Sequence, residues 1–167
     1  MELFKINSEC ALEEHLVGLL QERNMTVSTA ESCTGGLIAG AIVNAAGAST
    51  VLNEGYITYA NEAKERLIGV SHETLEKYGA VSAETAREMA LGAAKACGSN
   101  VGLSSTGIAG PGGGTKEKPV GLVYIGCSVD GEVHVRELHL CGNRMEIRLH
   151  TVEEALKLAA TMLAQRI

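Results

Sequence analysis

The sequence contains, at residues 29–36, the stretch Thr29-Ala30-Glu31-Ser32-Cys33-Thr34-Gly35-Gly36, around which the rest of the chain can be interpreted. The β-branched run that enters it predicts a strand over residues 26–30. The apolar run that follows it, residues 37–43, fits a buried helix or a buried strand by periodicity alone. The paired glycines favour a strand–turn–helix arrangement, because glycine lets the backbone turn sharply and lets a ligand approach the main chain.

Ser32 is the first candidate for chemistry in this stretch. A helix that begins after Gly36 would direct unpaired N–H groups, and the positive end of its dipole, at whatever lies above Ser32. A serine hydroxyl beside main-chain donors is suited to nucleophilic attack on a carbonyl. Taken alone, these residues favour a simpler role, in which Ser32 or Thr34 only caps the helix. Cys33 is a rival nucleophile, since a helix N-terminus lowers the pKa of a nearby thiol.

Length and composition narrow the class of protein. At 167 residues the chain is expected to form one domain, residues 1–167, with a core of Ala, Val, Ile and Leu because Trp is absent. The net charge of −6 argues against a nucleic-acid partner, which needs clustered basic charge. The five cysteines form no C-x-x-C pair, so no zinc site or disulfide framework is indicated. With no signal-peptide profile and no membrane-spanning apolar stretch, we expect a cytoplasmic protein without a membrane partner.

Helix and strand signals alternate along the chain until residue 106 and are then interrupted by a hairpin. Asp130-Gly131 predicts the turn of that hairpin, and slipped alternation in its second arm predicts a bulge near Arg136-Glu137. This order predicts an α/β fold, a three-layer α/β/α sandwich with a mixed, mainly parallel sheet. The expected helices are 9–23 (capped by Ser8), 37–43, 62–68 (capped by Asn61), 71–79, 83–97 (capped by Ser82) and 144–164; the expected strands are 26–30, 51–59, 101–106, 120–129 and 132–140.

The fold predicts that three loops converge. In open α/β sheets, loops at the carboxyl ends of strands form the binding crevice. The loops after Thr29, Tyr59 and Thr106 are of this type, so Ser32, Lys64 and a glycine loop are expected at one site. The glycines at 107, 110, 112, 113 and 114 can form an anion-binding concavity, although a flexible surface loop fits them as well. Their spacing matches neither the Walker A nor the dinucleotide-binding pattern.

Lys64 is expected in the first turn of a helix, where a cation is unfavourable. Local sequence favours an ordinary solvated lysine. A lysine can accept a serine proton, however, where burial or nearby positive charge lowers its pKa from about 10.4, and Ser–Lys pairs are a known variant of the catalytic triad. Arg144 and Arg148 lie one turn apart on the last helix and form either a solvated face or an anion clamp. The five histidines match no metal-binding spacing.

Three motifs together resemble the CinA C-terminal domain family: residues 29–36, Tyr59 with Asn61-Glu62-Ala63-Lys64, and Thr106-Gly-Ile-Ala-Gly-Pro-Gly-Gly-Gly114. The segment Gly142-Asn143-Arg144 with Arg148 resembles that family's Gly-Asp-Arg…Arg, with Asn143 in place of Asp. The resemblance covers nearly the whole chain. It implies an enzyme of pyridine nucleotide salvage that hydrolyses nicotinamide mononucleotide to nicotinic acid mononucleotide and ammonia, with a Ser/Lys pair and without a metal or organic cofactor.

The resemblance also implies roles for individual residues. Ser32 would attack the carboxamide, Lys64 would take its proton, and Tyr59 would hydrogen-bond within this pair. Main-chain donors near 34–36 or 106–107 would stabilise the oxyanion, and the glycine loop with one arginine would hold the phosphate. The alternatives are a non-catalytic nucleotide-binding or regulatory module of the same fold and a cysteine amidase that uses Cys33. A homo-oligomer is expected. The expected substrate-binding residues are Thr34, Gly35, Gly36, Thr106, Gly107, Gly110, Gly112, Gly113, Arg144 and Arg148.

Overall fold

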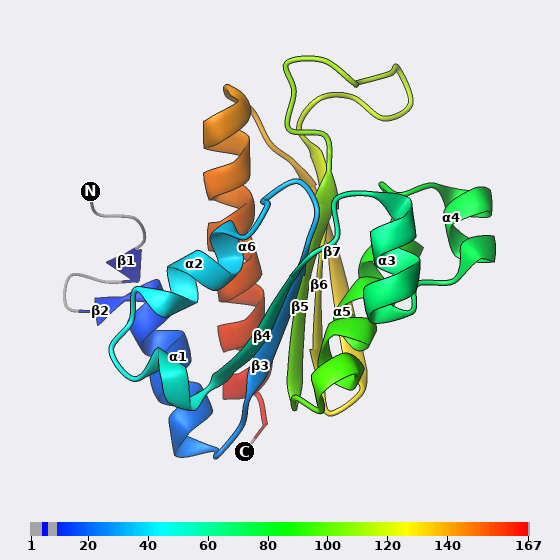
Figure 1. Cartoon of the computed structure of the whole chain (residues 1–167). Coiled ribbons are helices and arrows are strands. Elements are labelled where there is room, and N and C mark those ends of the chain that lie inside the picture. Colours follow the sequence, from blue (N-terminus) through cyan, green and yellow to red (C-terminus); the bar gives the residue numbers. More distant parts are fainter. Residues whose placement is uncertain (1–4, 7–9, 167) are drawn as a thin grey trace.

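A twisted five-stranded sheet forms the centre of the molecule (Figure 1). The computed structural model describes residues 5–6 and 10–166. The strand order is β4-β3-β5-β6-β7, in which β3, β4 and β5 are mutually parallel while β6 and β7 are antiparallel to their neighbours. A separate short pair is formed by β1 (Lys5–Ile6) and β2 (Cys10–Ala11). The bounds are β3 (Val27–Glu31), β4 (Leu52–Ile57), β5 (Val101–Gly107), β6 (Leu122–Val129) and β7 (Glu132–His139).

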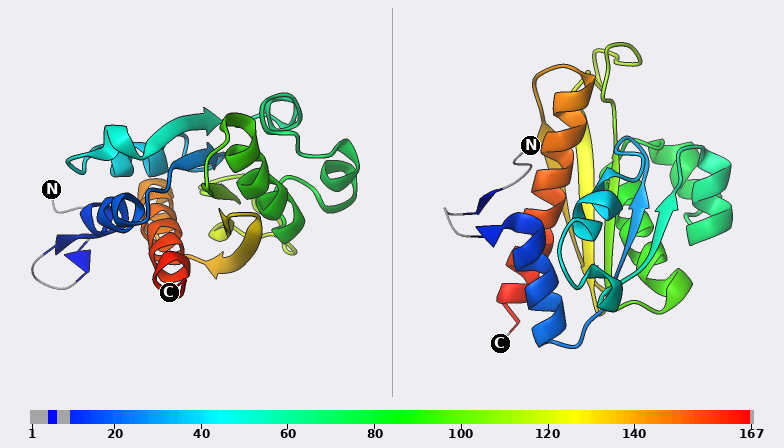
Figure 2. Two further views of the ribbon diagram at one scale, coloured as in Figure 1. Left: turned by 90° about the horizontal axis from the view of Figure 1, so that it is seen from below. Right: turned by 60° about the vertical axis from the view of Figure 1, so that its left-hand side comes forward.

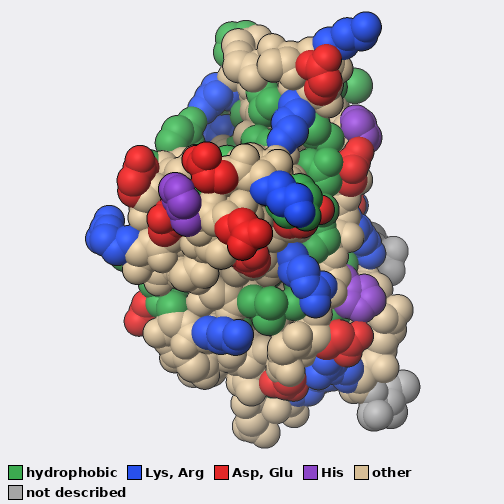
Figure 3. All heavy atoms as spheres, turned by 90° about the vertical axis from the view of Figure 1, so that its right-hand side faces the viewer, with side chains coloured by type: hydrophobic (Ala, Val, Ile, Leu, Met, Phe, Trp, Pro, Cys, Tyr) green, Lys and Arg blue, Asp and Glu red, His purple; other side chains and the backbone are tan. Residues whose placement is uncertain are grey.

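Helices cover both faces of this sheet, which confirms the predicted three-layer α/β/α sandwich with a mixed sheet (Figure 2). The larger hydrophobic cluster lies under α1, α2 and α6, and the smaller one lies under α3, α4 and α5. Acidic and basic side chains are interspersed on the outer surface of the second helix layer (Figure 3). None of the described helices is apolar over a length that would cross a bilayer. The bounds are α1 (Leu12–Glu22), α2 (Leu37–Val43), α3 (Asn61–Ile68), α4 (His72–Tyr78), α5 (Ala83–Cys97), α6 (Arg144–Ala164) and a 3₁₀ turn, η1 (Ala48–Thr50).

Most of the expected helix boundaries have a visible cause. The Ser82 hydroxyl caps α5 as predicted, because it accepts a hydrogen bond from the main-chain N–H three residues on. Ser71, predicted as the first residue of its helix, caps α4 in the same way, and that helix begins at His72. The predicted cap at Asn61 is wrong, because Ala60 occupies that position in an extended conformation and Asn61 is already helical. The first helix begins at Leu12 rather than at residue 9. Ser8, its predicted cap, lies outside the described residues.

The predicted bulge in β7 is also wrong. The register between β6 and β7 is continuous from the pair Leu122–His139 to the pair Val129–Glu132. Val133 and Val135 are half-buried on the side of α5, whereas Leu138 packs against the hydrophobic cluster under α6. The phase of the apolar residues therefore changes because the two faces of this edge strand are covered at different places.

Candidate functional site

The carboxyl ends of β3, β4 and β5 bring the three expected loops together at one end of the sheet (Figure 1). Ser32 directly follows β3, residues 58–60 lead from β4 into α3, and the glycine loop leaves β5 at residue 107. Although Ser32 and Lys64 are far apart in sequence, Lys64 Nζ lies 3.4 Å from Ser32 Oγ. This separation is long for a hydrogen bond.

Lys64 is a fully buried lysine with a defined set of acceptors. Its side chain has no exposed surface, and its Nζ donates to the carbonyl oxygens of Thr58 at 2.8 Å and Tyr59 at 3.2 Å. Burial lowers the pKa of Lys64, against smaller opposing effects of Cys33 and Glu62. A neutral amine has two N–H groups and one lone pair. In the structure Nζ also donates to Ser32 Oγ; an amine that has lost one proton would keep its two N–H groups on the carbonyls and leave its lone pair for the Ser32 hydroxyl.

A second buried charge, Glu31, holds the loop that carries Ser32. Its carboxylate has no exposed surface and accepts five hydrogen bonds. Three come from main-chain N–H groups at the start of α2, and two come from threonine hydroxyls. The donors are Gly36 N (3.0 Å), Ile38 N (2.9 Å), Ala39 N (2.9 Å), Thr29 Oγ1 (3.1 Å) and Thr34 Oγ1 (2.6 Å).

The free N–H groups at the N-terminus of α2 are therefore bound by a side chain of the protein itself. The expectation that it faces a ligand above Ser32 is wrong, because the Glu31 carboxylate takes that place. The capping role for Ser32 or Thr34 is not observed either, since Gly36 occupies the cap position with a φ of 97°. Sequence reasoning gave Glu31 no role, although an acidic residue shortly before a helix start is a recognised signal.

Cys33 lies next to Ser32 but lacks the character of a nucleophile. The thiol is buried, and this burial raises its pKa to about 11. The direction is opposite to the one expected from a helix N-terminus, whose N–H groups are bound to Glu31. The Ser105 hydroxyl, of a residue that the sequence did not single out, hydrogen-bonds the Thr34 hydroxyl at 2.6 Å.

The two arginines of α6 make different contacts. Arg144 donates to the Gly110 carbonyl at 2.7 Å and to the Tyr59 hydroxyl at 3.3 Å. Arg148 donates to the carbonyl oxygens of Cys33 at 3.1 Å and Thr34 at 2.8 Å. The Tyr59 side chain is 62% exposed and points to Arg144, so only its main-chain carbonyl joins the Ser32–Lys64 pair.

Residues 107–110, 112 and 113 of the glycine loop line a cavity of about 210 Å³, together with Cys33, Tyr59 and Arg144. The N–H groups of Gly110, Gly112 and Gly113 have no hydrogen-bond acceptor within the described part of the chain. The side chain of Thr106 faces away, because its hydroxyl donates to the Ala80 carbonyl at 2.6 Å. Main-chain donors and an arginine at one cavity are the groups that bind an anion.

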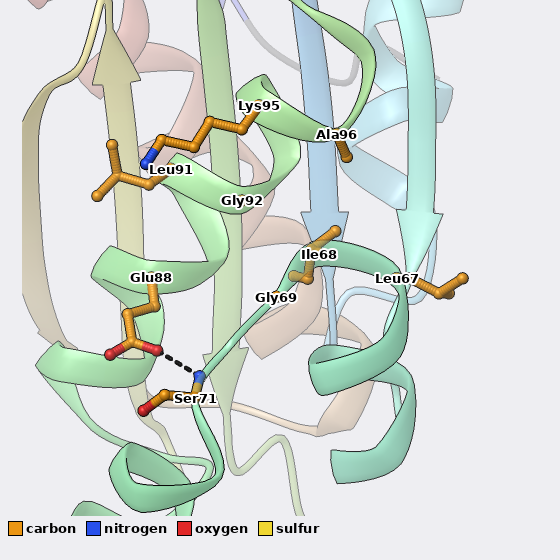
Figure 4. Close-up of a pocket in the computed structure, with 9 residues that line it drawn as sticks. All are labelled: Leu67, Ile68, Gly69, Ser71, Glu88, Leu91, Gly92, Lys95 and Ala96. Carbon is orange, nitrogen blue, oxygen red and sulfur yellow. Dashed lines mark hydrogen bonds between the residues drawn. The ribbon is translucent and has the colours of Figure 1, made fainter.

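A larger cavity, of about 510 Å³, lies elsewhere between α3 and α5 (Figure 4). Its acidic residue, Glu88, accepts a hydrogen bond from the Ser71 N–H at 2.7 Å, as the dashed line shows, and a second from Thr74. Ser32 and Lys64 line neither cavity, but the smaller one is lined by Cys33, the residue after Ser32, and by Tyr59, whose carbonyl binds Lys64 Nζ, whereas no neighbour of this kind lines the larger one. The chemistry therefore selects the smaller cavity at the strand ends as the candidate site.

Known proteins share this sequence and this fold. The family model of the CinA C-terminal domain matches residues 9–163. A protein of Clostridium novyi, named for competence-damage inducibility, is 58% identical over 151 residues, which are 90% of this chain and 36% of that protein. A CinA-like protein of Kosmotoga olearia is 60% identical over 140 residues, 84% of this chain and 34% of that protein. The chain thus spans about a third of the length of the curated relatives it matches.

Solved structures agree along almost the full chain. The competence/damage inducible protein CihA from Agrobacterium tumefaciens is 45% identical with a TM-score of 0.89, covering 99% of this chain and 100% of that one. A competence-damaged protein (CinA) superfamily protein from Escherichia coli is 30% identical with a TM-score of 0.85, covering 97% of this chain and 95% of that one.

Proposed function

The chain belongs to the CinA C-terminal domain family, and from this membership and the geometry of its site we propose that it is an amidohydrolase acting on nicotinamide mononucleotide. The products would be nicotinic acid mononucleotide and ammonia. The observation that carries the proposal is the buried Lys64 amine, which is bound to two carbonyl oxygens and directed at Ser32 Oγ. A lysine held in this way is a base for a serine nucleophile rather than a surface charge.

The reaction would proceed through an acyl-enzyme. Ser32 Oγ attacks the carboxamide carbon while neutral Lys64 accepts the hydroxyl proton. The tetrahedral intermediate then collapses, the C–N bond breaks, and Lys64 protonates the leaving amine so that it departs as ammonia. In the second half, Lys64 takes a proton from water as the water oxygen attacks the ester. Cleavage of the ester returns that proton to Ser32 and releases the carboxylic acid.

The nucleotide would bind in the cavity beside this pair. The unpaired N–H groups of Gly110, Gly112 and Gly113 would bind the phosphate, and Arg144 lines the same cavity. Arg144 is solvent-exposed and already contacts the loop at the Gly110 carbonyl, so it can follow the loop onto a bound phosphate. The raised pKa of Cys33 argues against the cysteine amidase, because little thiolate is present near neutral pH.

Ammonia release tests the proposal directly. Purified wild type is compared with Ser32→Ala, Lys64→Met and the control Lys95→Met, which removes an exposed lysine of α5. We expect release from nicotinamide mononucleotide by wild type and control, and a loss of at least about 10³-fold in the other two. Release retained by folded Ser32→Ala would contradict the mechanism. If folded wild type releases no ammonia while nucleotides raise its Tm, the chain is a binding module instead.

A further inference from the structure

Arg148 holds the main chain of the Ser32 loop instead of facing the candidate cavity. Its guanidinium donates to two successive carbonyls, Cys33 O and Thr34 O, through Nε and Nη2 respectively. The side chain is half-buried and lies over Gly35, where a Cβ atom would sit 3.5 Å from Nη2. Arg144 lines the candidate cavity, together with Cys33 and Tyr59. Arg148 does not line it; it lines a neighbouring, more apolar cavity beside Pro111 and Val120.

This contact fixes the direction of a peptide N–H group. In a trans peptide the C=O and N–H bonds point in opposite directions. Because the Cys33 carbonyl points to Arg148, the Thr34 N–H of the same peptide points away from Arg148. The Thr34 carbonyl is held in the same way, and the N–H of that peptide, Gly35 N, donates to the Ser32 carbonyl at 3.1 Å.

The other N–H groups near Ser32 are mostly occupied. Ser32 N donates to the Ser105 carbonyl at 2.9 Å, and Gly36 N donates to Glu31. Neither Cys33 N nor Thr34 N has an acceptor among the residues that the structure describes, and of these two donors only Thr34 N belongs to a peptide whose carbonyl Arg148 holds. An unoccupied main-chain donor two residues from a nucleophile is placed to stabilise the oxyanion of a tetrahedral intermediate. The guanidinium charge on the Cys33 carbonyl also polarises the peptide and strengthens this donor.

We propose that Arg148 is a positioning residue that aims the Thr34 N–H at the developing oxyanion, and that it does not hold the substrate's phosphate. The proposal rests on the amidase function proposed above. It separates the roles of the two arginines of α6, with Arg148 acting on the rate of acyl transfer and Arg144 acting on nucleotide binding.

The test separates rate from binding. We would measure kcat for ammonia release and the Kd of the product, nicotinic acid mononucleotide, by calorimetry for wild type and for Arg148→Ala and Arg148→Lys. Loss of one oxyanion donor lowers kcat by about 10²–10³-fold, and we expect a loss approaching this for Arg148→Ala. The product Kd should stay within about threefold. Arg148→Lys should lose less, because an ammonium group can bind one carbonyl but not both in a fork.

Two comparison variants complete the design. Arg144→Ala should show the reverse pattern, a weaker product Kd with a smaller change in kcat. Arg87, on α5, donates to the Val133 carbonyl at 3.3 Å, away from the candidate site. Arg87→Ala is therefore the control that shows what the loss of an arginine–carbonyl hydrogen bond does in itself. The proposal is overturned if both Arg148 variants keep kcat within about twofold, or if they weaken the product Kd as much as they lower kcat. Inactivity of wild type would instead refute the amidase function itself.

Discussion

Replacing Glu31 by glutamine removes one buried charge and one acceptor from the start of α2. The side-chain oxygen that accepts from Thr34, Gly36 and Ile38 can be kept as the amide oxygen. The new NH₂ group then faces the Ala39 N–H, which leaves a buried donor opposite another donor at a cost of about 1–3 kcal/mol. The remaining bonds lose their charge assistance and the helix dipole loses its anion, while relief of the carboxylate's desolvation offsets part of this.

The net loss expected from Glu31→Gln is about 2–4 kcal/mol in the free energy of unfolding. For a chain of this size each kcal/mol corresponds to about 2–4 °C, so Tm should fall by about 5–15 °C. Calorimetry and urea unfolding would measure it, with the exposed loop residue Glu117→Gln as a control expected within about 0.5 kcal/mol of wild type. A fall in Tm of less than about 2 °C would refute the idea that this carboxylate anchors the loop.

Three further predictions follow from buried groups. Because burial lowers the pKa of Lys64, the folded protein loses this proton at a lower pH than the unfolded chain does. The free energy of unfolding should therefore rise with pH between the lowered pKa and about 10.4, the pKa in the unfolded chain. Urea unfolding of Lys64→Met should lack this rise. Cys33, with its pKa raised to about 11, should react with iodoacetamide at pH 7.5 far more slowly than the exposed Cys141, and equal rates by mass spectrometry would contradict its burial. Gly92→Ala should cost about 1–3 kcal/mol in thermal unfolding, because a Cβ there would collide with the main-chain carbonyl oxygen of Ile68. Gly18→Ala, where nothing lies within 4 Å of the added Cβ, should stabilise α1 by about 0.5–1 kcal/mol in the same measurement.

The sequence predicted the fold well wherever a local signal agreed with long-range packing. The hairpin turn at Asp130-Gly131, the Ser82 cap of α5 and the bounds of α6 all depend on residues close together in the chain. The alternation of helices and strands also sufficed to predict that the loops bearing Ser32 and Lys64 converge, because parallel strands align their carboxyl ends.

What the sequence did not predict depends on where side chains point. The sequence could not show that Lys64 is buried, with its amine bound to the carbonyls of Thr58 and Tyr59. The apolar phase of β7 depends on which helix covers each face, so it suggested a bulge that does not exist. The predicted direction of the Cys33 pKa shift was wrong for a related reason, because the N–H groups at the start of α2, which would lower this pKa, are bound to the Glu31 carboxylate.

The placement of Glu31 changes how the site must work. A helix N-terminus would offer N–H groups to the oxyanion, but those of Gly36, Ile38 and Ala39 are bound to the carboxylate. A negative charge this close to the reacting atoms would also oppose an oxyanion if it were not neutralised by those donors. The cation that faces the same loop from the other side is Arg148, on the carbonyls of residues 33 and 34. On the proposal made above, the peptide between Cys33 and Thr34, which lies between these two opposite charges, would take the part in stabilising the oxyanion that the dipole of α2 would otherwise play.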